Sequence, residues 1–167
     1  MDPYDEAYVK AIKFLSFRPR SEKEVRDNLL KKKKYDSVVI ERVIATLQRQ
    51  NFLNDHEFAK WWVNSRKQFK MRAERIIRLE LRQKGVAKEI IDESLQIKED
   101  DEHPVQDDAT LAEKLVKKQL PRYKGIPKNE VYKKLGGFLA RRGFDWETIK
   151  RSIDHCMKEE YNTSKWQ

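Results

Sequence analysis

One short pattern occurs three times in this chain and constrains its fold more than any other feature. In each copy a leucine precedes a cationic run, a hydrophobic residue stands five positions after the leucine, and an isoleucine stands five beyond that: Leu30, Tyr35 and Ile40; Leu81, Val86 and Ile91; Leu139, Phe144 and Ile149. The leucines are 51 and 58 residues apart (30 to 81 and 81 to 139). Self-similarity at a spacing near this range is typical of repeat proteins. The pattern predicts three copies of one helical module; the alternative is a chance resemblance between basic amphipathic helices.

Apolar residues at helical spacing predict nine helices in three triplets, and no stretch alternates as a β-strand does. A module of about 50 residues buries too little surface to be robust alone, so neighbouring modules should share contacts. We expect an all-α fold of three tandem three-helix (helix-turn-helix-like) repeats that form an elongated, curved body. The expected boundaries are 1–52 for repeat 1, 53–98 for repeat 2, 99–108 for an acidic linker, 109–160 for repeat 3 and 161–167 for a tail.

Local signals mark where the middle helix of each triplet begins and ends. Ser21 and Glu24 have the spacing of a capping box, ahead of a helix that runs to about residue 33 with Leu30 among its inward residues. Gly85 and Gly143 suit the left-handed backbone conformation that ends helices. Lys34 stands where the other two copies have glycine, so the first middle helix should end differently.

The charge is unevenly spread along the chain. The formal net charge is +9, with +4 in residues 1–53, +4 in residues 54–98 and +1 in residues 99–167. A basic protein of this size often meets a polyanion, so nucleic acid is the leading class of partner. The acidic residues 99–102, followed by Pro104, indicate a solvated linker and lack the pattern of a calcium loop.

A basic surface is the candidate binding site. Its lysines and arginines could neutralise DNA phosphates, single- or double-stranded, without reading sequence. The alternative is a solvated helix face with local pairs such as Arg78 with Glu74. Trp61 could stack on a base, anchor a protein interface, or simply pack. The candidates are Lys31, Lys32, Lys33, Lys34, Trp61, Arg66, Lys67, Lys70, Arg72, Arg75, Arg78, Arg82, Lys84, Arg141 and Arg142.

Catalysis is poorly supported, and we expect no cofactor and no metal site. The three histidines lie in different contexts, without metal-ligand spacing. His155 and Cys156 are neighbours, but adjacent helix residues point about 100° apart. No glycine-rich phosphate loop exists, and Gly136-Gly137 lies inside a predicted helix, where it would permit close packing. The chain is therefore expected not to be an enzyme.

One cysteine excludes an intrachain disulfide, which suits a reducing compartment. No apolar run approaches the roughly 18 residues that a membrane span requires, and the N-terminus lacks the apolar core of a signal peptide. We expect a cytoplasmic protein without membrane contact, and a monomer.

Several of these stretches, in this order, resemble the RecX family of bacterial regulators of the RecA recombinase. They are Ser21-x-x-Glu24-Val25, Leu53-Asn54-Asp55 with Phe58-Ala59, Val63 and Arg66, the run from Glu80 to Val86, and the run from Phe138 to Asp145. The resemblance covers nearly the whole chain and implies tandem three-helix repeats. It further implies binding in the groove of the RecA–DNA filament, limiting filament growth, ATP hydrolysis, strand exchange and the SOS response to DNA damage. A stand-alone DNA-binding helical protein is the other hypothesis.

Overall fold

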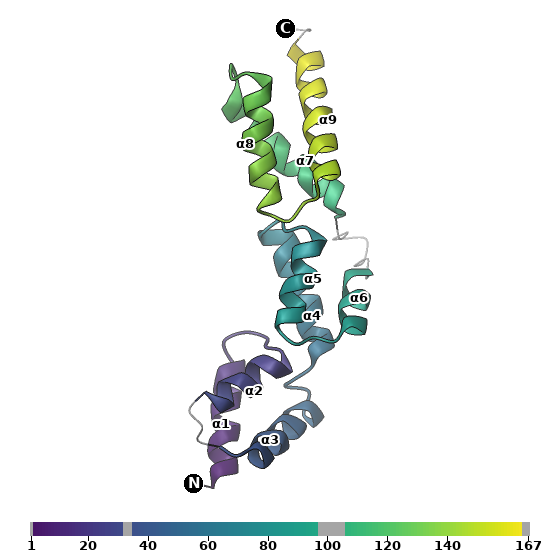
Figure 1. Cartoon of the computed structure of the whole chain (residues 1–167). Coiled ribbons are helices and arrows are strands. Elements are labelled where there is room, and N and C mark those ends of the chain that lie inside the picture. Colours follow the sequence, from purple (N-terminus) through teal and green to yellow (C-terminus); the bar gives the residue numbers. More distant parts are fainter. Residues whose placement is uncertain (1, 32–34, 97–105, 165–167) are drawn as a thin grey trace. The chain divides into compact units, whose positions relative to one another are not determined.

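A computed structural model describes residues 2–31, 35–96 and 106–164, and of residues 160–164 only the backbone. Within these ranges every regular element is helical, which confirms the all-α prediction (Figure 1). The elements are α1 Pro3–Leu15, α2 Glu22–Leu30, α3 Ser37–Arg49, α4 Asp55–Asn64, the π-helix η1 Ser65–Phe69, α5 Glu74–Gln83, α6 Lys88–Gln96, α7 Asp108–Gln119, the 3₁₀-helix η2 Leu120–Tyr123, α8 Lys128–Ala140 and α9 Trp146–Ser164. None of these helices is long and apolar enough to cross a bilayer.

By internal contacts the chain divides into two compact units. Unit 1 consists of Met1–Val63 and Arg78–Ile97, and unit 2 of Asn64–Ile77 and Lys98–Gln167. Helix α7 begins at Asp108 with Asp107 as its N-cap, so these two residues, expected in the linker, belong to the helix and its cap. Residues 99–105 of the expected linker lie outside the described residues.

Each unit has its own hydrophobic core. In unit 1, α1 packs against α2 and α3. In unit 2, α7 packs against α8 and α9, and Ala73, just before α5, joins the same core. The largest fully buried side chains of these two cores are Val25, Leu29, Ile40 and Leu47 in unit 1 and Leu135, Leu139, Ile149 and Ile153 in unit 2.

Two of the three middle helices end on glycine as predicted. Gly85 (φ 78°) and Gly143 (φ 94°) adopt the left-handed conformation. The next residue in each case donates its N–H back to the carbonyl of the leucine in the repeated pattern, Val86 to Leu81 at 3.1 Å and Phe144 to Leu139 at 3.4 Å. These bonds satisfy carbonyls that a helix end otherwise leaves open, and they place Val86 and Phe144 in the interior.

The first copy differs, and our alignment of Leu30 was wrong. Leu30 is 46% exposed, whereas Leu29 is fully buried and occupies the core position. Tyr35 follows Leu29 by six residues, while Val86 and Phe144 follow their leucines by five. Since the first copy has no glycine for a tight left-handed turn, it has one residue more between equivalent core positions.

The start of α2 is held by two contacts within unit 1. The Ser21 hydroxyl donates to the Lys84 carbonyl at 2.7 Å, and the Glu22 N–H donates to the Asp55 carboxylate at 2.8 Å. The capping box of Ser21 and Glu24 is present as predicted. Burial of the Asp55 carboxylate raises its pKa.

The start of α5 repeats this arrangement within unit 2. The Ala73 N–H donates to the Arg142 carbonyl at 3.0 Å, and the Glu74 N–H donates to both Asp108 carboxylate oxygens at 3.1 Å. Burial raises the pKa of Asp108 as it does that of Asp55. In both units, therefore, the start of a middle helix binds an aspartate at the start of a following helix and a carbonyl just before a glycine turn.

Gly136 does not serve close packing as we expected. A methyl group on Gly136 would lie 3.6 Å from Trp146 Cζ3 and 3.9 Å from Ile149 Cγ2, which are ordinary contact distances. Because glycine in a helix interior costs about 1 kcal/mol relative to alanine, we expect Gly136→Ala to raise the free energy of unfolding by about 0.5–1 kcal/mol. Urea denaturation followed by circular dichroism measures this, and a lower midpoint than wild type would contradict it.

Candidate nucleic-acid interface

Four arginines meet in unit 2 where α8 ends against the start of α5. Arg72 Nη1 donates to the Arg141 carbonyl at 2.9 Å, and Arg75 Nε donates to the Gly143 carbonyl at 3.4 Å. These bonds satisfy carbonyls at the end of α8, where the helix dipole also favours cations. We call Arg72, Arg75, Arg141 and Arg142 the arginine cluster.

The arginine cluster has no ion-paired carboxylate among the described residues. Burial, together with the charges of Arg72 and Arg141, lowers the pKa of Arg142. The Arg142 guanidinium lies 4.0 Å from the centre of the Phe138 ring, and its buried Nε has no hydrogen-bond partner among the described residues. Among the described residues, none of the four arginines forms an ion pair with a carboxylate. An anionic ligand would supply the missing partner.

The other predicted cations of unit 2 lie on or beside the π-helix η1. Arg66 is half-buried and Lys70 is exposed. Lys67 is only 8% exposed, and its ammonium donates to the Gln106 carbonyl at 3.4 Å. The expectation that Lys67 lies on an open basic surface was therefore wrong. The prediction took Lys67 together with the other cations of its stretch, and the contact that holds it comes from Gln106, 39 positions away.

In unit 1 some of the predicted cations form ion pairs and others are exposed. Arg78 forms an ion pair with Asp92 of α6, so its charge is partly neutralised within the unit. Lys31 and Arg82 are exposed. Lys32, Lys33 and Lys34 lie outside the described residues.

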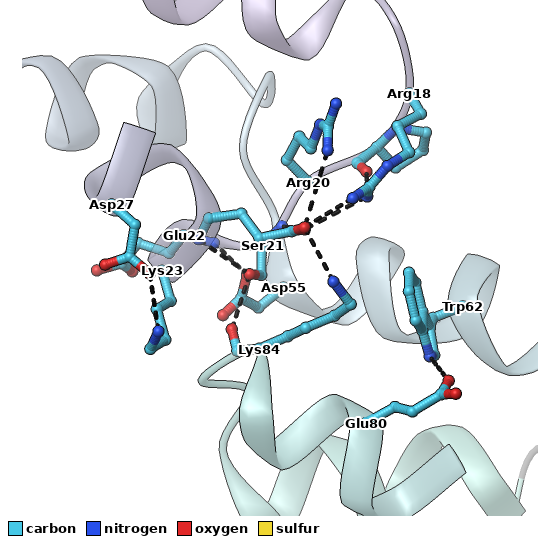
Figure 2. A network of polar contacts seen from close by, with 12 residues as sticks. Arg18, Arg20, Ser21, Glu22, Lys23, Asp27, Asp55, Trp62, Glu80 and Lys84 are labelled. Atoms are coloured by element: carbon cyan, nitrogen blue, oxygen red, sulfur yellow. Dashed lines mark hydrogen bonds and ion pairs between the residues drawn. The ribbon is translucent and has the colours of Figure 1, made fainter. Parts of the chain in front are cut away.

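Lys84 belongs to a polar network around Glu24. Nitrogen atoms of Arg18, Arg20 and Lys84 lie 2.6, 3.8 and 2.9 Å from one carboxylate oxygen, that of Glu24. Figure 2 shows these three side chains directed toward one point. Burial alone would raise the pKa of Glu24, but hydrogen bonds from Arg18, Lys84 and the Ser21 N–H outweigh it and hold the pKa at about 2. Lys84 therefore has a structural role that links α2 to the end of α5.

The paired tryptophans of α4 have different environments. Trp62 is 6% exposed, donates from its indole nitrogen to Glu80 at 2.8 Å, and has the Lys84 ammonium 4.3 Å from its ring centre (Figure 2). Trp61 is half-buried, with the Arg18 guanidinium 5.8 Å from its ring centre. Trp61 thus keeps an open part, as expected if it takes part in binding.

Sequence reasoning missed Arg18 and Arg20 as candidate binding residues. They flank Pro19 in the loop between α1 and α2, where a proline between two arginines was the available signal. Their significance depends on contacts with Glu24 and with rings, and these are not visible in local patterns.

Nothing in the described residues forms a metal-binding cluster of histidine, cysteine and carboxylates. Cys156 is 2% exposed, and burial raises the pKa of its thiol from 9.0 to about 11, so it is protonated at neutral pH. His155 lies 3.3 Å from Glu159 on its own helix. The pair His155-Cys156 therefore lacks the geometry of a base and its nucleophile.

Family models match three consecutive stretches of the chain. Residues 7–47 match the first three-helix domain of RecX, residues 54–95 the second, and residues 106–153 the third. The prediction of tandem three-helix repeats is confirmed.

Curated relatives and solved structures agree with these matches. The relatives named Regulatory protein RecX include the following three. That of Clostridium tetani is 36% identical over 93% of this chain and 69% of its own length, and that of Prosthecochloris aestuarii 33% identical over 91% and 94%. That of Bacillus cytotoxicus is 32% identical over 97% of this chain, which spans 57% of that relative's length. The crystal structure of RecX from Lactobacillus salivarius shares the fold, with a TM-score of 0.75 at 23% identity over 93% of this chain and 97% of that chain.

Proposed function

Because the chain belongs to the RecX family, we propose that it regulates a RecA recombinase by binding the RecA–DNA filament and limiting its extension. Limited extension lowers DNA-dependent ATP hydrolysis and strand exchange, and with them the response to DNA damage. The protein acts by binding, without chemistry of its own, in the cytoplasm and as a monomer.

The arginine cluster is the observation that supports this proposal most. The side chains of Arg72 and Arg75 lie on carbonyls at the end of α8, and the charges of Arg72 and Arg141 act on Arg142. None of the four arginines is paired with a carboxylate in the described chain. Arginine matches the geometry of phosphate oxygens and is always charged. A polyphosphate backbone held inside a protein filament is a ligand of the required charge and needs no base reading. The exposed Lys31, Lys70 and Arg82 would add weaker phosphate contacts.

Charge reversal in the cluster is expected to weaken binding to the filament. Arg75 and Arg141 are the members to change, because both side chains are exposed. The hydrogen bond from Arg72 goes to the backbone carbonyl of Arg141, so it does not depend on the Arg141 side chain. The Arg75→Glu/Arg141→Glu variant should bind RecA–single-stranded DNA filaments at least about tenfold more weakly, with a smaller dependence on salt. Co-sedimentation with preassembled filaments over a range of salt concentrations measures both quantities.

A matched control has the same change in net charge elsewhere in unit 2. Lys124→Glu/Lys150→Glu alters two exposed lysines outside the cluster and should weaken binding by less than about threefold. Equal weakening by both variants would mean that only net charge matters and would remove the cluster from the site. Equal affinity of the wild-type protein for bare DNA and for filaments would instead favour a stand-alone DNA-binding protein.

A further inference from the structure

Unit 1 contains a groove that the proposed function does not use. It has a volume of about 780 Å³ and lies between the end of α1, the 16–20 loop, the 51–54 loop and α4. Its apolar walls include Ile12, Leu15, Phe52 and Trp61. Phe52 is 57% exposed, although a phenyl ring on a protein surface gains free energy by being covered. A groove of this size and composition suits one or two large apolar side chains of a partner.

The polar side of the groove has an excess of cations. Arg18 and Arg20 line it, and both share the single Glu24 carboxylate with Lys84. Of the three cations around Glu24, Arg20 has the weakest contact with the carboxylate, because its Nη1 lies 3.8 Å from the Glu24 oxygen. Its buried Nε has no hydrogen-bond partner in the described chain. Burial and the nearby charge of Arg18 lower the pKa of Arg20, as expected for a guanidinium that lacks a full counter-charge.

The one carboxylate on the groove wall does not balance this excess. Glu57 also lines the groove, but its side chain is 70% exposed and pairs with Lys60 at 3.4 Å. Lys60 therefore offsets the charge of Glu57. A ligand that carries an apolar side chain next to a carboxylate would complement both sides of the groove.

We propose that this groove binds an acidic peptide segment of a protein partner, with a large apolar side chain beside Phe52 and Trp61 and a carboxylate on Arg20. A nucleobase fits less well, because stacking requires an open aromatic face. The Trp61 ring is flanked by the Arg18 guanidinium at 5.8 Å and by the Phe58 ring at 6.1 Å, and Ile12 and Leu15 of α1 form an aliphatic wall. Phe52 is the only lining ring whose side chain is largely exposed, so a base could stack on one ring at most. This site is independent of the arginine cluster in unit 2.

The test uses capped hexapeptides and the ¹⁵N-labelled full chain. The probe is Asp-Glu-Phe-Leu-Asp-Glu, and its two comparison peptides replace either the four acids by lysine or the Phe-Leu pair by Ser-Ser. We expect the acidic apolar probe to shift the Trp61 indole and Phe52 amide resonances at sub-millimolar concentration. Either comparison peptide should bind at least about fivefold more weakly. No shift at about 1 mM probe would overturn the proposal, as would tighter binding of a decathymidylate at the same resonances.

Matched variants localise the binding. Phe52→Ala and Arg20→Gln should each lower the affinity for the acidic apolar probe by at least about fivefold. Phe17→Ala changes a phenyl ring that is 74% exposed and outside the groove lining, and Lys13→Gln removes an exposed charge from α1; both should stay within about twofold of wild type. Circular dichroism checks that each variant is folded. Equal losses in the groove variants and their controls would contradict the assignment.

Discussion

Replacing Gly143 by alanine is expected to destabilise unit 2 by about 2–5 kcal/mol, the largest expected effect of a single substitution. The added Cβ would lie 2.1 Å from Ile76 Cγ1 and 3.1 Å from Ile76 Cβ, and Ile76 Cβ cannot move without its backbone. Overpacking of this kind costs about 1–3 kcal/mol. The left-handed backbone at φ 94° adds about 1–2 kcal/mol for any residue with a Cβ. The free energy of unfolding, from urea titration followed by circular dichroism, measures the sum.

Gly125→Ala separates the two contributions to this effect. Gly125 has a similar left-handed φ of 78°, but nothing lies within 4 Å of the added Cβ. It should therefore show the backbone cost alone, about 1–2 kcal/mol. Combining Gly143→Ala with Ile76→Ala should cost less than the two single variants together, because the smaller side chain leaves room for the methyl group. Equal costs for Gly143→Ala and Gly125→Ala would contradict the packing of Gly143 against Ile76.

Replacing Glu24 by glutamine is expected to cost about 2–3 kcal/mol at neutral pH. The glutamine side chain can still cap the Ser21 N–H, so the variant removes mainly the charge. Arg18, Arg20 and Lys84 would then keep partly buried positive charges without their shared carboxylate. The depression of the Glu24 pKa from 4.5 to about 2 corresponds to about 3 kcal/mol at 1.36 kcal/mol per unit.

The pH dependence of this cost has a definite sign. A carboxyl group whose pKa is lower in the folded than in the unfolded state stabilises the fold above the unfolded value, and this contribution is lost as pH falls through the folded value. The difference in the free energy of unfolding between wild type and Glu24→Gln should therefore have its full value above about pH 5. It should decrease as the pH falls from 4.5 and be lost at about pH 2. Urea titrations at several pH values measure it.

Glu147→Gln is the control for Glu24→Gln. Glu147 pairs with Arg151 at 2.7 Å, but its side chain is 80% exposed, so its loss should cost no more than the usual 0 to about 1 kcal/mol. A cost for Glu24→Gln as small as this, or a difference from wild type that stays constant with pH, would show that the Glu24 network does not stabilise the fold.

Features set by neighbouring residues were predicted well. The capping box of Ser21 and Glu24 and the turns at Gly85 and Gly143 were each read from a few adjacent positions. Each depends on backbone groups within one turn, so the local sequence contains the necessary information.

Features that depend on turn length or on distant residues were not predicted from the sequence. Leu30 was taken for a core residue because equal turn lengths were assumed, and Lys67 was taken for a surface residue together with the other cations of its stretch. The arginine cluster joins residues 69 and 68 positions apart, and Lys84 reaches Glu24 across 60 positions. The members of the cluster were all named from the sequence, but no local pattern could show which of them meet, because tertiary packing decides that.

DNA-dependent ATP hydrolysis by the cognate RecA, with this chain titrated from far below one copy per RecA protomer, tests the proposed function most directly. Binding that stops filament extension acts on many protomers at once, so inhibition should be substantial at well below one copy per protomer. Arg75→Glu/Arg141→Glu should require at least about tenfold more protein for the same inhibition. Undiminished ATP hydrolysis at one copy per protomer, with the wild-type chain bound to the filaments, would contradict regulation by limited filament extension.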